Sequence, residues 1–185
     1  MKLENSFQVD APPEKAWDLL MDVPRIIPCM PGAKLDETVS DSNWLATMQV
    51  KLGPIGLTFA TDCKRTDVDE ANRSVTLKAD ARETRNRGRA SASIVSSLTP
   101  ENGGTRVDIV TDVSLAGTLA QYGRGMIEDI STQMVTSFAT CLQAQLGEST
   151  EEAEAAVAAQ AKPISGLSLF FGSIGRKIRG IFRRS

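Results

Sequence analysis

The residue types that carry most enzyme chemistry are scarce in this sequence. Its 185 residues include no histidine, which removes His-based triads, histidine general bases and nearly all histidine metal sites. Cys29, Cys63 and Cys141 are widely spaced and form no CxxC pair, so they predict neither a zinc site nor a disulfide framework. Free thiols fit a reducing cytoplasm. Because the sequence contains no recognisable set of catalytic residues, the chain is predicted not to be an enzyme.

Two other groups of residues have types that bind ligands or partners. Tyr122, the only tyrosine, precedes Gly123-Arg124-Gly125, where glycines would let a ligand approach the backbone. The alternative is a loose helix entry with a solvated arginine. A predicted hairpin turn is crowded with arginines, which form either a basic docking tip or a merely solvated turn. These arginines are Arg82, Arg85, Arg87 and Arg89.

The charges are divided unevenly along the chain. Residues 1–161 carry 15 basic and all 23 acidic residues, a net charge of −8, whereas residues 162–185 carry six Lys and Arg and no acid. Such an asymmetry predicts a basic tail with an anionic partner. The first residues contain no apolar run, so no signal peptide is expected.

The basic tail has the spacing of an amphipathic helix that lies in a membrane surface. Large apolar residues recur at intervals of three and four, and basic residues occupy mainly the opposite side. No stretch is long enough to span a bilayer. A groove on a partner protein, or the chain's own domain, is the alternative docking place. A nucleic-acid partner is not indicated, because the body is acidic. The predicted membrane-binding residues are Leu167, Phe170, Phe171, Ile174, Arg176, Lys177, Ile178, Arg179, Ile181, Phe182, Arg183 and Arg184.

The elements ahead of the tail predict an α+β domain. Residues 2–9 alternate as a strand, Pro13 opens a helix, and the prolines that follow allow only short helical turns. From Lys34 to Leu115 about six period-two strands predict an antiparallel meander with one covered face. Spacings of three and four then predict a long helix from about Leu119 to Leu146, which would cover the sheet.

Three segments follow from these patterns. Residues 1–146 are predicted to be a ligand-binding domain, residues 147–162 an acidic linker rich in Ala and Glu, and residues 163–185 a membrane-binding tail. The linker contains one large apolar residue, Val157, so we expect it to be solvated, with nothing to pack against.

The covered face of the sheet is apolar but contains several alanines, so a curved sheet would leave an apolar pocket under the long helix. The alternative is that these side chains simply fill the core. The predicted lining residues are Trp44, Met48, Leu57, Phe59, Leu77, Ile94, Leu115, Tyr122, Met126, Ile127, Ile130 and Met134.

Specific residues accompany this order of elements. The segments PEKAWDLL (13–20), IPCMPGA (27–33) and VKLGPI (50–55), and Gly123-Arg124-Gly125 before the last helix, resemble the G-subunit family of carbon monoxide dehydrogenase. That family is a branch of the START and Bet v 1-like helix-grip superfamily. The resemblance covers about residues 1–146, and Cys-Met-Pro-Gly-Ala is its most specific piece.

The resemblance implies a fold and a function. The fold is a seven-stranded antiparallel sheet curved around a long C-terminal helix, with short N-terminal helices and an apolar cavity. The function is that of an accessory protein that recruits a molybdenum hydroxylase of the carbon monoxide dehydrogenase type to the inner face of the cytoplasmic membrane. The cavity would suit a quinone or a lipid tail, with no covalent cofactor. A general apolar-ligand carrier without an enzyme partner, and a cyclase or hydrolase, are the alternatives; the latter lacks converging acid–base residues.

Overall fold

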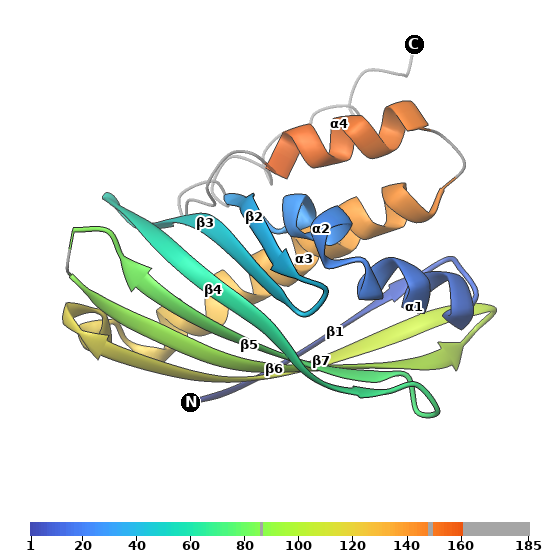
Figure 1. Cartoon of the computed structure of the whole chain (residues 1–185), viewed down its shortest axis with the longest axis horizontal. Coiled ribbons are helices and arrows are strands. Elements are labelled where there is room, and N and C mark those ends of the chain that lie inside the picture. Colours follow the sequence, from blue (N-terminus) through green and yellow to red (C-terminus); the bar gives the residue numbers. More distant parts are fainter. Residues whose placement is uncertain (86, 148–149, 161–185) are drawn as a thin grey trace, which may run out of the picture.

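Alternating apolar and polar side chains build a curved antiparallel sheet in the computed structural model, which describes residues 1–85, 87–147 and 150–160 (Figure 1). The seven strands lie in the order β1-β7-β6-β5-β4-β3-β2, so each pairs with its sequence neighbour except β1, which pairs with β7. This confirms the predicted seven-stranded sheet. The strands are β1 (Lys2–Val9), β2 (Ala33–Ser40), β3 (Asn43–Leu52), β4 (Ile55–Asp69), β5 (Ser74–Glu83), β6 (Gly88–Glu101) and β7 (Gly104–Gly117).

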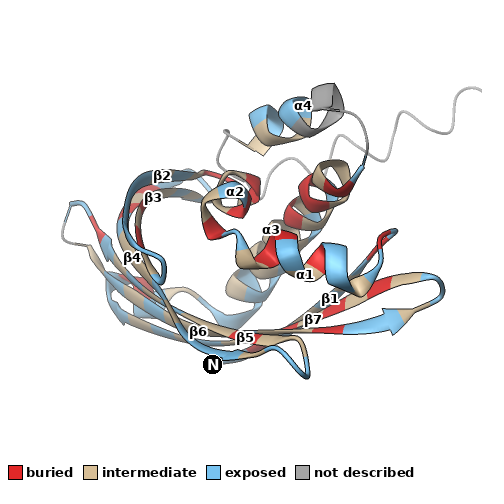
Figure 2. Ribbon diagram, turned by 45° about the vertical axis from the view of Figure 1, so that its right-hand side comes forward, coloured by how far each residue is buried: buried red, intermediate tan, exposed pale blue. Residues whose placement is uncertain are grey.

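The helices lie on the concave side of the sheet (Figures 1 and 2). Pro13 begins α1 (Pro13–Met21), and prolines again stand near the starts of α2 (Val23–Ile26) and of the single 3₁₀ turn η1 (Ile27–Cys29). The long helix α3 (Arg124–Leu146) begins about five residues later than predicted. The reason is that a separate 3₁₀ turn, η2 (Thr118–Gln121), and two extended residues, Tyr122 and Gly123, precede it.

The main core lies at one end of α3. Phe138, Cys141, Leu142 and Leu146, all in the C-terminal half of the helix, are buried. They join a cluster that contains apolar residues of α1, α2 and η1 and of strands β1, β6 and β7. The rings of Phe7 and Phe138 meet edge to face, with centroids 6.1 Å apart. Packing therefore fixes the C-terminal half of α3 against the sheet.

A disulfide reinforces this packing and corrects the expectation that the cysteines are free. Cys29 of η1 and Cys141 of α3 are bonded, with their Cα atoms 5.4 Å apart, and both are buried. Their separation of 112 residues gives no hint of the pair, which only the docking of η1 on α3 creates. Cys63 is free. Only one of the three cysteines on which the expectation of a reducing compartment rested is therefore a free thiol.

A fourth helix corrects the expectation of a solvated linker. Residues Thr150–Gln160 form α4, and Ala156 and Val157 pack against the main core. The Gly32 amide donates to the Gln160 carbonyl at 2.8 Å, and Gln160 Nε2 donates to the Ser137 carbonyl at 3.4 Å. One valine and one small alanine side chain are enough to let the helix lie close to its neighbours, which the low apolar content of the segment did not indicate.

The predicted membrane-binding tail, residues 163–185, lies outside the described residues. Its membrane-binding residues and the proposed boundaries of the three segments therefore stay predictions. Within the part of the chain that the structure describes, no helix is long and apolar enough to cross a bilayer.

A buried carboxylate fixes the turn between β5 and β6. Glu83 is 2% exposed and accepts the backbone N–H groups of Arg85, at 2.8 Å, and Arg87, at 3.1 Å. Burial acts to raise the pKa of this carboxyl, but the N–H groups of Arg87 and Arg85 and the charge of Arg87 outweigh it, so the pKa is lowered. The ionised carboxylate is therefore part of the folded turn.

The disulfide predicts one titratable thiol per unfolded chain when no reductant is added, the thiol of Cys63. Replacing Cys141→Ser should lower the free energy of unfolding by about 2–5 kcal/mol, because the bridge closes a long loop in the unfolded chain. Thiol titration in denaturant and urea unfolding measure the two quantities. Cys63→Ser is the control and should change stability little. Three thiols per chain in protein from the native host would contradict the bridge.

The Glu83 carboxylate predicts a pH-dependent contribution to stability. Its lowered pKa stabilises the fold above the ordinary value of 4.5, and this contribution is lost as the pH falls through the folded-state pKa. Glu83→Gln should therefore lower the melting temperature at neutral pH, and the difference from wild type should shrink as the solution is acidified. Thermal unfolding across pH tests this, with the exposed Glu37→Gln as control. A difference that does not change with pH would refute the assignment.

Candidate functional site

The concave face of the sheet carries all seven strand residues predicted to line a pocket. Strand register places Trp44 opposite Cys63, Met48 opposite Phe59 and Leu77 opposite Ile94. Between these larger side chains run rows of small ones: Thr61, Ala81 and Ala90 form one row, and Cys63, Ala79 and Ala92 another. These short side chains project little from the centre of the concave face.

The helix that covers this face touches it unevenly. Contacts between α3 and the sheet are concentrated on β1, where Asn5 Nδ2 donates to Ser131 Oγ at 3.0 Å. In the N-terminal half of α3, Ile127 and Ile130 are only partly buried and Met126 is 43% exposed. Partly exposed residues face them from the sheet: Met48, Leu77, Ile94 and Leu115. Solvent therefore reaches apolar side chains on both walls.

Half of the predicted lining residues belong to one cluster. Leu57 and Phe59 are buried against Leu52 and Leu119, and Met48, Leu115, Tyr122 and Ile130 pack around them. Leu119 was not predicted, because the sequence pattern assigned it to the start of the long helix rather than to η2. Leu77, Met126, Ile127 and Met134 lie outside both clusters, and Ile94 packs on the main core.

Trp44 lies apart from this cluster and is 2% exposed. The Arg65 guanidinium lies 5.4 Å from its ring centre and donates to the carbonyls of Met21, at 3.0 Å, and Asp41, at 2.7 Å. Arg65 thus joins β4 to the end of α1 and to the β2–β3 turn, closing this end of the concave face. Arg65 was not predicted from the sequence, because no local residue pattern indicates its distant partners.

Two polar groups on the concave face lack a protein partner. Trp44 Nε1 and Thr61 Oγ1 are buried, and neither has a hydrogen-bond partner among the described residues. They stand in neighbouring rows, since Trp44 pairs with Cys63, and Ala46, two residues further along β3, pairs with Thr61. Buried indole N–H and hydroxyl groups normally find partners, so these two are exceptions on the concave face.

The Tyr122-Gly123-Arg124-Gly125 segment agrees better with the solvated helix entry than with a ligand-binding backbone. Arg124 is exposed, and its Nε donates to Glu128 at 2.7 Å. A side chain at Gly123 or Gly125 would meet no atom within 4 Å, so neither glycine is required by a close approach. Arg124 and Glu128 line a cleft of ≈ 410 Å³ beside Lys2 and Glu4, which are also paired with each other, at 2.7 Å.

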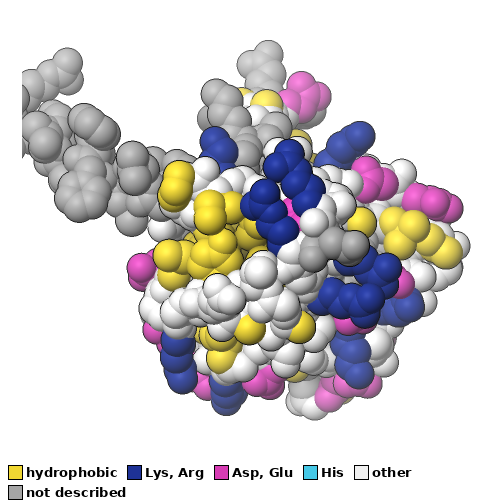
Figure 3. All heavy atoms as spheres, turned by 90° about the vertical axis from the view of Figure 1, so that its left-hand side faces the viewer, with side chains coloured by type: hydrophobic (Ala, Val, Ile, Leu, Met, Phe, Trp, Pro, Cys, Tyr) yellow, Lys and Arg dark blue, Asp and Glu magenta, His cyan; other side chains and the backbone are white. Residues whose placement is uncertain are grey.

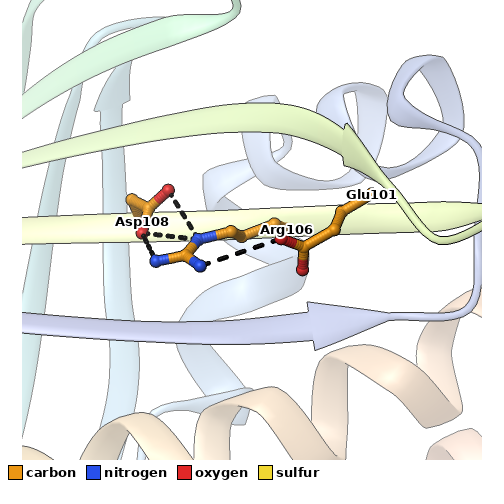
Figure 4. Close-up of polar contacts among 3 residues, drawn as sticks. All are labelled: Glu101, Arg106 and Asp108. Atoms are coloured by element: carbon orange, nitrogen blue, oxygen red, sulfur yellow. Dashed lines mark hydrogen bonds and ion pairs between the residues drawn. The ribbon is translucent and has the colours of Figure 1, made fainter.

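The titratable groups do not converge on the concave face. Burial, and then the charge of Asp62, raise the pKa of the Cys63 thiol, which therefore stays protonated and unreactive. The most connected ion pair is on the convex face of β7, where Arg106 Nη2 lies 2.8 Å from Asp108 and Arg106 Nη1 lies 3.8 Å from Glu101 (Figure 4). No group of three or more Cys, Asp and Glu in the described ranges could hold a metal ion. Among the described residues, the concave face therefore carries apolar side chains and no evident acid–base pair.

Solved structures with the same fold are distant in sequence. A conserved protein from Geobacillus kaustophilus has a TM-score of 0.70 and 20% identity, over 79% of this chain and 95% of its own. Ara h 8.0201 has a TM-score of 0.54 and 15% identity, over 79% and 97%. A protein from Rhizobium leguminosarum has a TM-score of 0.53 and 15% identity, over 79% and 93%. At these identities the likeness concerns the START and Bet v 1-like fold alone.

The family comparison is more specific. Among curated proteins, none matches the sequence. The profile of the CoxG family, described as the G subunit of carbon monoxide dehydrogenase, matches residues 6–147, a range that runs from within β1 to the end of α3. Since this is well over half of the chain, it belongs to the CoxG family.

Proposed function

We propose that this chain is a non-catalytic accessory protein that binds an apolar ligand between its sheet and α3. It recruits a molybdenum hydroxylase of the carbon monoxide dehydrogenase type to the inner face of the cytoplasmic membrane. Membership of the family supports the association with such an enzyme. The observation that carries the ligand-binding part is the partly exposed apolar concave face, opposed by partly exposed apolar residues of α3.

The exposure of these two walls is a physical reason for a ligand. Apolar surface in contact with water costs about 25 cal/mol per Å², and Leu77, Ile94 and Ile130 all retain some of it. An apolar molecule of matching shape would cover both walls at once. Methionines at positions 48, 126 and 134 give these walls adaptable side chains.

The ligand that best suits this lining is a quinone. The lining offers two groups without a protein partner among the described residues, Trp44 Nε1–H and the Thr61 hydroxyl, and both can donate to a carbonyl oxygen. Quinones combine carbonyl oxygens with an apolar isoprenoid tail. A bound quinone would link the partner enzyme's electrons to the respiratory chain.

The basic tail supports the membrane part of the proposal. Residues 162–185 have six basic residues, no acidic ones and an apolar stripe, the composition of a segment that binds anionic lipid. The acidic body, in contrast, is repelled by such a surface as a whole. A tether of this kind would attach the protein reversibly.

Trp44→Phe should weaken quinone binding about two- to tenfold, because it removes one hydrogen bond and keeps an aromatic ring. Titration of the full chain with a short-chain ubiquinone, followed by fluorescence, measures the affinity. Trp17→Phe is the matched control, since Trp17 packs on the main core instead of the concave face, and it should leave the affinity unchanged. Equal affinities for all three proteins would show that the indole N–H does not contact the ligand.

Ile174→Glu combined with Ile178→Glu should reduce binding to vesicles of phosphatidylcholine and phosphatidylglycerol by more than about tenfold, because two large apolar side chains leave the membrane-facing stripe. Co-sedimentation measures the bound fraction. Ser165→Glu with Ser173→Glu introduces the same charge outside the stripe and should have a smaller effect.

The same pair of variants tests recruitment in the native host. The isoleucine variant should move the molybdenum hydroxylase from the membrane fraction to the soluble fraction, and the serine variant should not. If the hydroxylase stays at the membrane while the isoleucine variant has left it, the chain is not its tether, and a general apolar-ligand carrier is the better account.

A further inference from the structure

Three segments meet at the end of the concave face away from the disulfide; we call this the open end. They are the β3–β4 tip (residues 52–55), the β5–β6 turn (residues 83–88) and η2. The Thr84 amide donates to the Thr58 carbonyl at 2.9 Å, joining the turn to β4, and the Thr118 amide donates to the Arg87 carbonyl at 2.9 Å, joining the turn to η2. Two residues separate the first turn of α3 from η2. Hydrogen bonds therefore connect the β5–β6 turn to both β4 and η2 at the open end.

Two arginines that flank the β5–β6 turn oppose each other on the convex face of the sheet, without a counterion among the described residues. Arg82 and Arg89 are partners across β5 and β6, both are exposed, and neither is within ion-pair distance of any described carboxylate. With Ser91, Ser114 and Asp80 they line a depression of ≈ 490 Å³. Like charges directly opposite each other destabilise a sheet. An anion bound between the two guanidinium groups would therefore reduce their electrostatic repulsion.

The acid in the turn, Glu83, forms no ion pair with the exposed arginines. Glu83 is turned into the protein and accepts backbone N–H groups, so its carboxylate does not bind the guanidinium groups at the surface. Arg85 is exposed and Arg87 is partly exposed. Two arginines in the turn and two in the strands that flank it therefore lie close together, three of them exposed.

Apolar side chains protrude beside this basic turn. Ile55, at the start of β4, is 38% exposed, and Met126, in the first turn of α3, is 43% exposed. Leu52, on the other side of the β3–β4 tip, belongs to the cluster that contains Leu119 and Tyr122. Seen from this end, hydrophobic side chains gather in a patch with Lys and Arg side chains beside it (Figure 3).

We infer that the open end is a second membrane-contact surface, on the domain itself, that docks on anionic lipid. Its arginines would bind headgroup phosphates while Ile55 and Met126 enter the interface. This inference rests on the proposed function. In this orientation the apolar space would face the bilayer, the phase in which a quinone dissolves. The chain's own tail is a poor occupant, because it has the same positive sign. An acidic protein surface would match the arginines but not the protruding apolar residues.

A polarity-sensitive dye tests this docking in the full chain. Ile55→Cys and Val68→Cys, each with Cys63→Ser, give matched sites, because both side chains lie on β4 and are 38% exposed, at opposite ends of the strand. With phosphatidylcholine–phosphatidylglycerol vesicles, the dye at 55 should shift to the blue and the dye at 68 should not. If both labelled proteins bind the vesicles through the tail and neither dye shifts, the inference is wrong while the tether stands.

Removing the arginine charges is the second test of this docking. Arg82→Gln with Arg89→Gln should weaken vesicle binding roughly tenfold or more, since each basic residue near anionic lipid contributes about 1 kcal/mol, or a factor of about five. The matched control is Lys64→Gln with Lys78→Gln, another cross-strand cationic pair, in which Lys64 already lies 3.1 Å from Asp62. Equal loss in the two variants, or loss in neither, would overturn the inference. Binding that is unchanged while association with the hydroxylase falls would assign the arginines to a protein surface.

Discussion

The long helix is fixed at one end and not at the other, and the rest of the structure depends on this constraint. Phe138, Cys141, Leu142 and Leu146 anchor the C-terminal half of α3 in the main core, and the bond from Cys141 to Cys29 adds a covalent tie. The N-terminal half rests on β1 through contacts such as Asn5–Ser131. A helix held in this way lies over the concave face, where Ile130 packs on the cluster of Leu57 and Phe59. Leu77, Ile94 and Leu115 keep part of their exposure.

This constraint gives the two ends of the molecule different roles. At the anchored end, α1, η1 and α4 complete the core, and Arg65 closes the face beside Trp44. At the open end, η2 and two hairpin tips surround the start of α3, and arginines stand next to exposed apolar side chains. A molecule that enters at the open end would find its hydrogen-bond donors, Trp44 and Thr61, deeper on the concave face. The ionised groups of β7 lie on the other side of the sheet (Figure 4).

Sequence patterns predicted the sheet well because period-two alternation is a direct consequence of strand geometry. The strand residues of the candidate pocket share one face for the same reason. What could not be predicted depends on contacts between distant segments. Cys29 and Cys141 are 112 residues apart, and Arg65 binds carbonyls of two other elements. The helix α4 docks through Ala156, Val157 and the hydrogen bonds of Gln160. The burial of Glu83 was likewise hidden, since a charged residue in a basic turn predicts exposure.

The proposal that the structure bears on most directly is that a quinone binds between the sheet and α3. The most direct measurement is mass spectrometry of an organic extract of the full-length protein, purified from its native host without detergent. The account predicts a quinone in an amount close to one per chain. An extract without quinone, whether empty or containing only phospholipid, would contradict it.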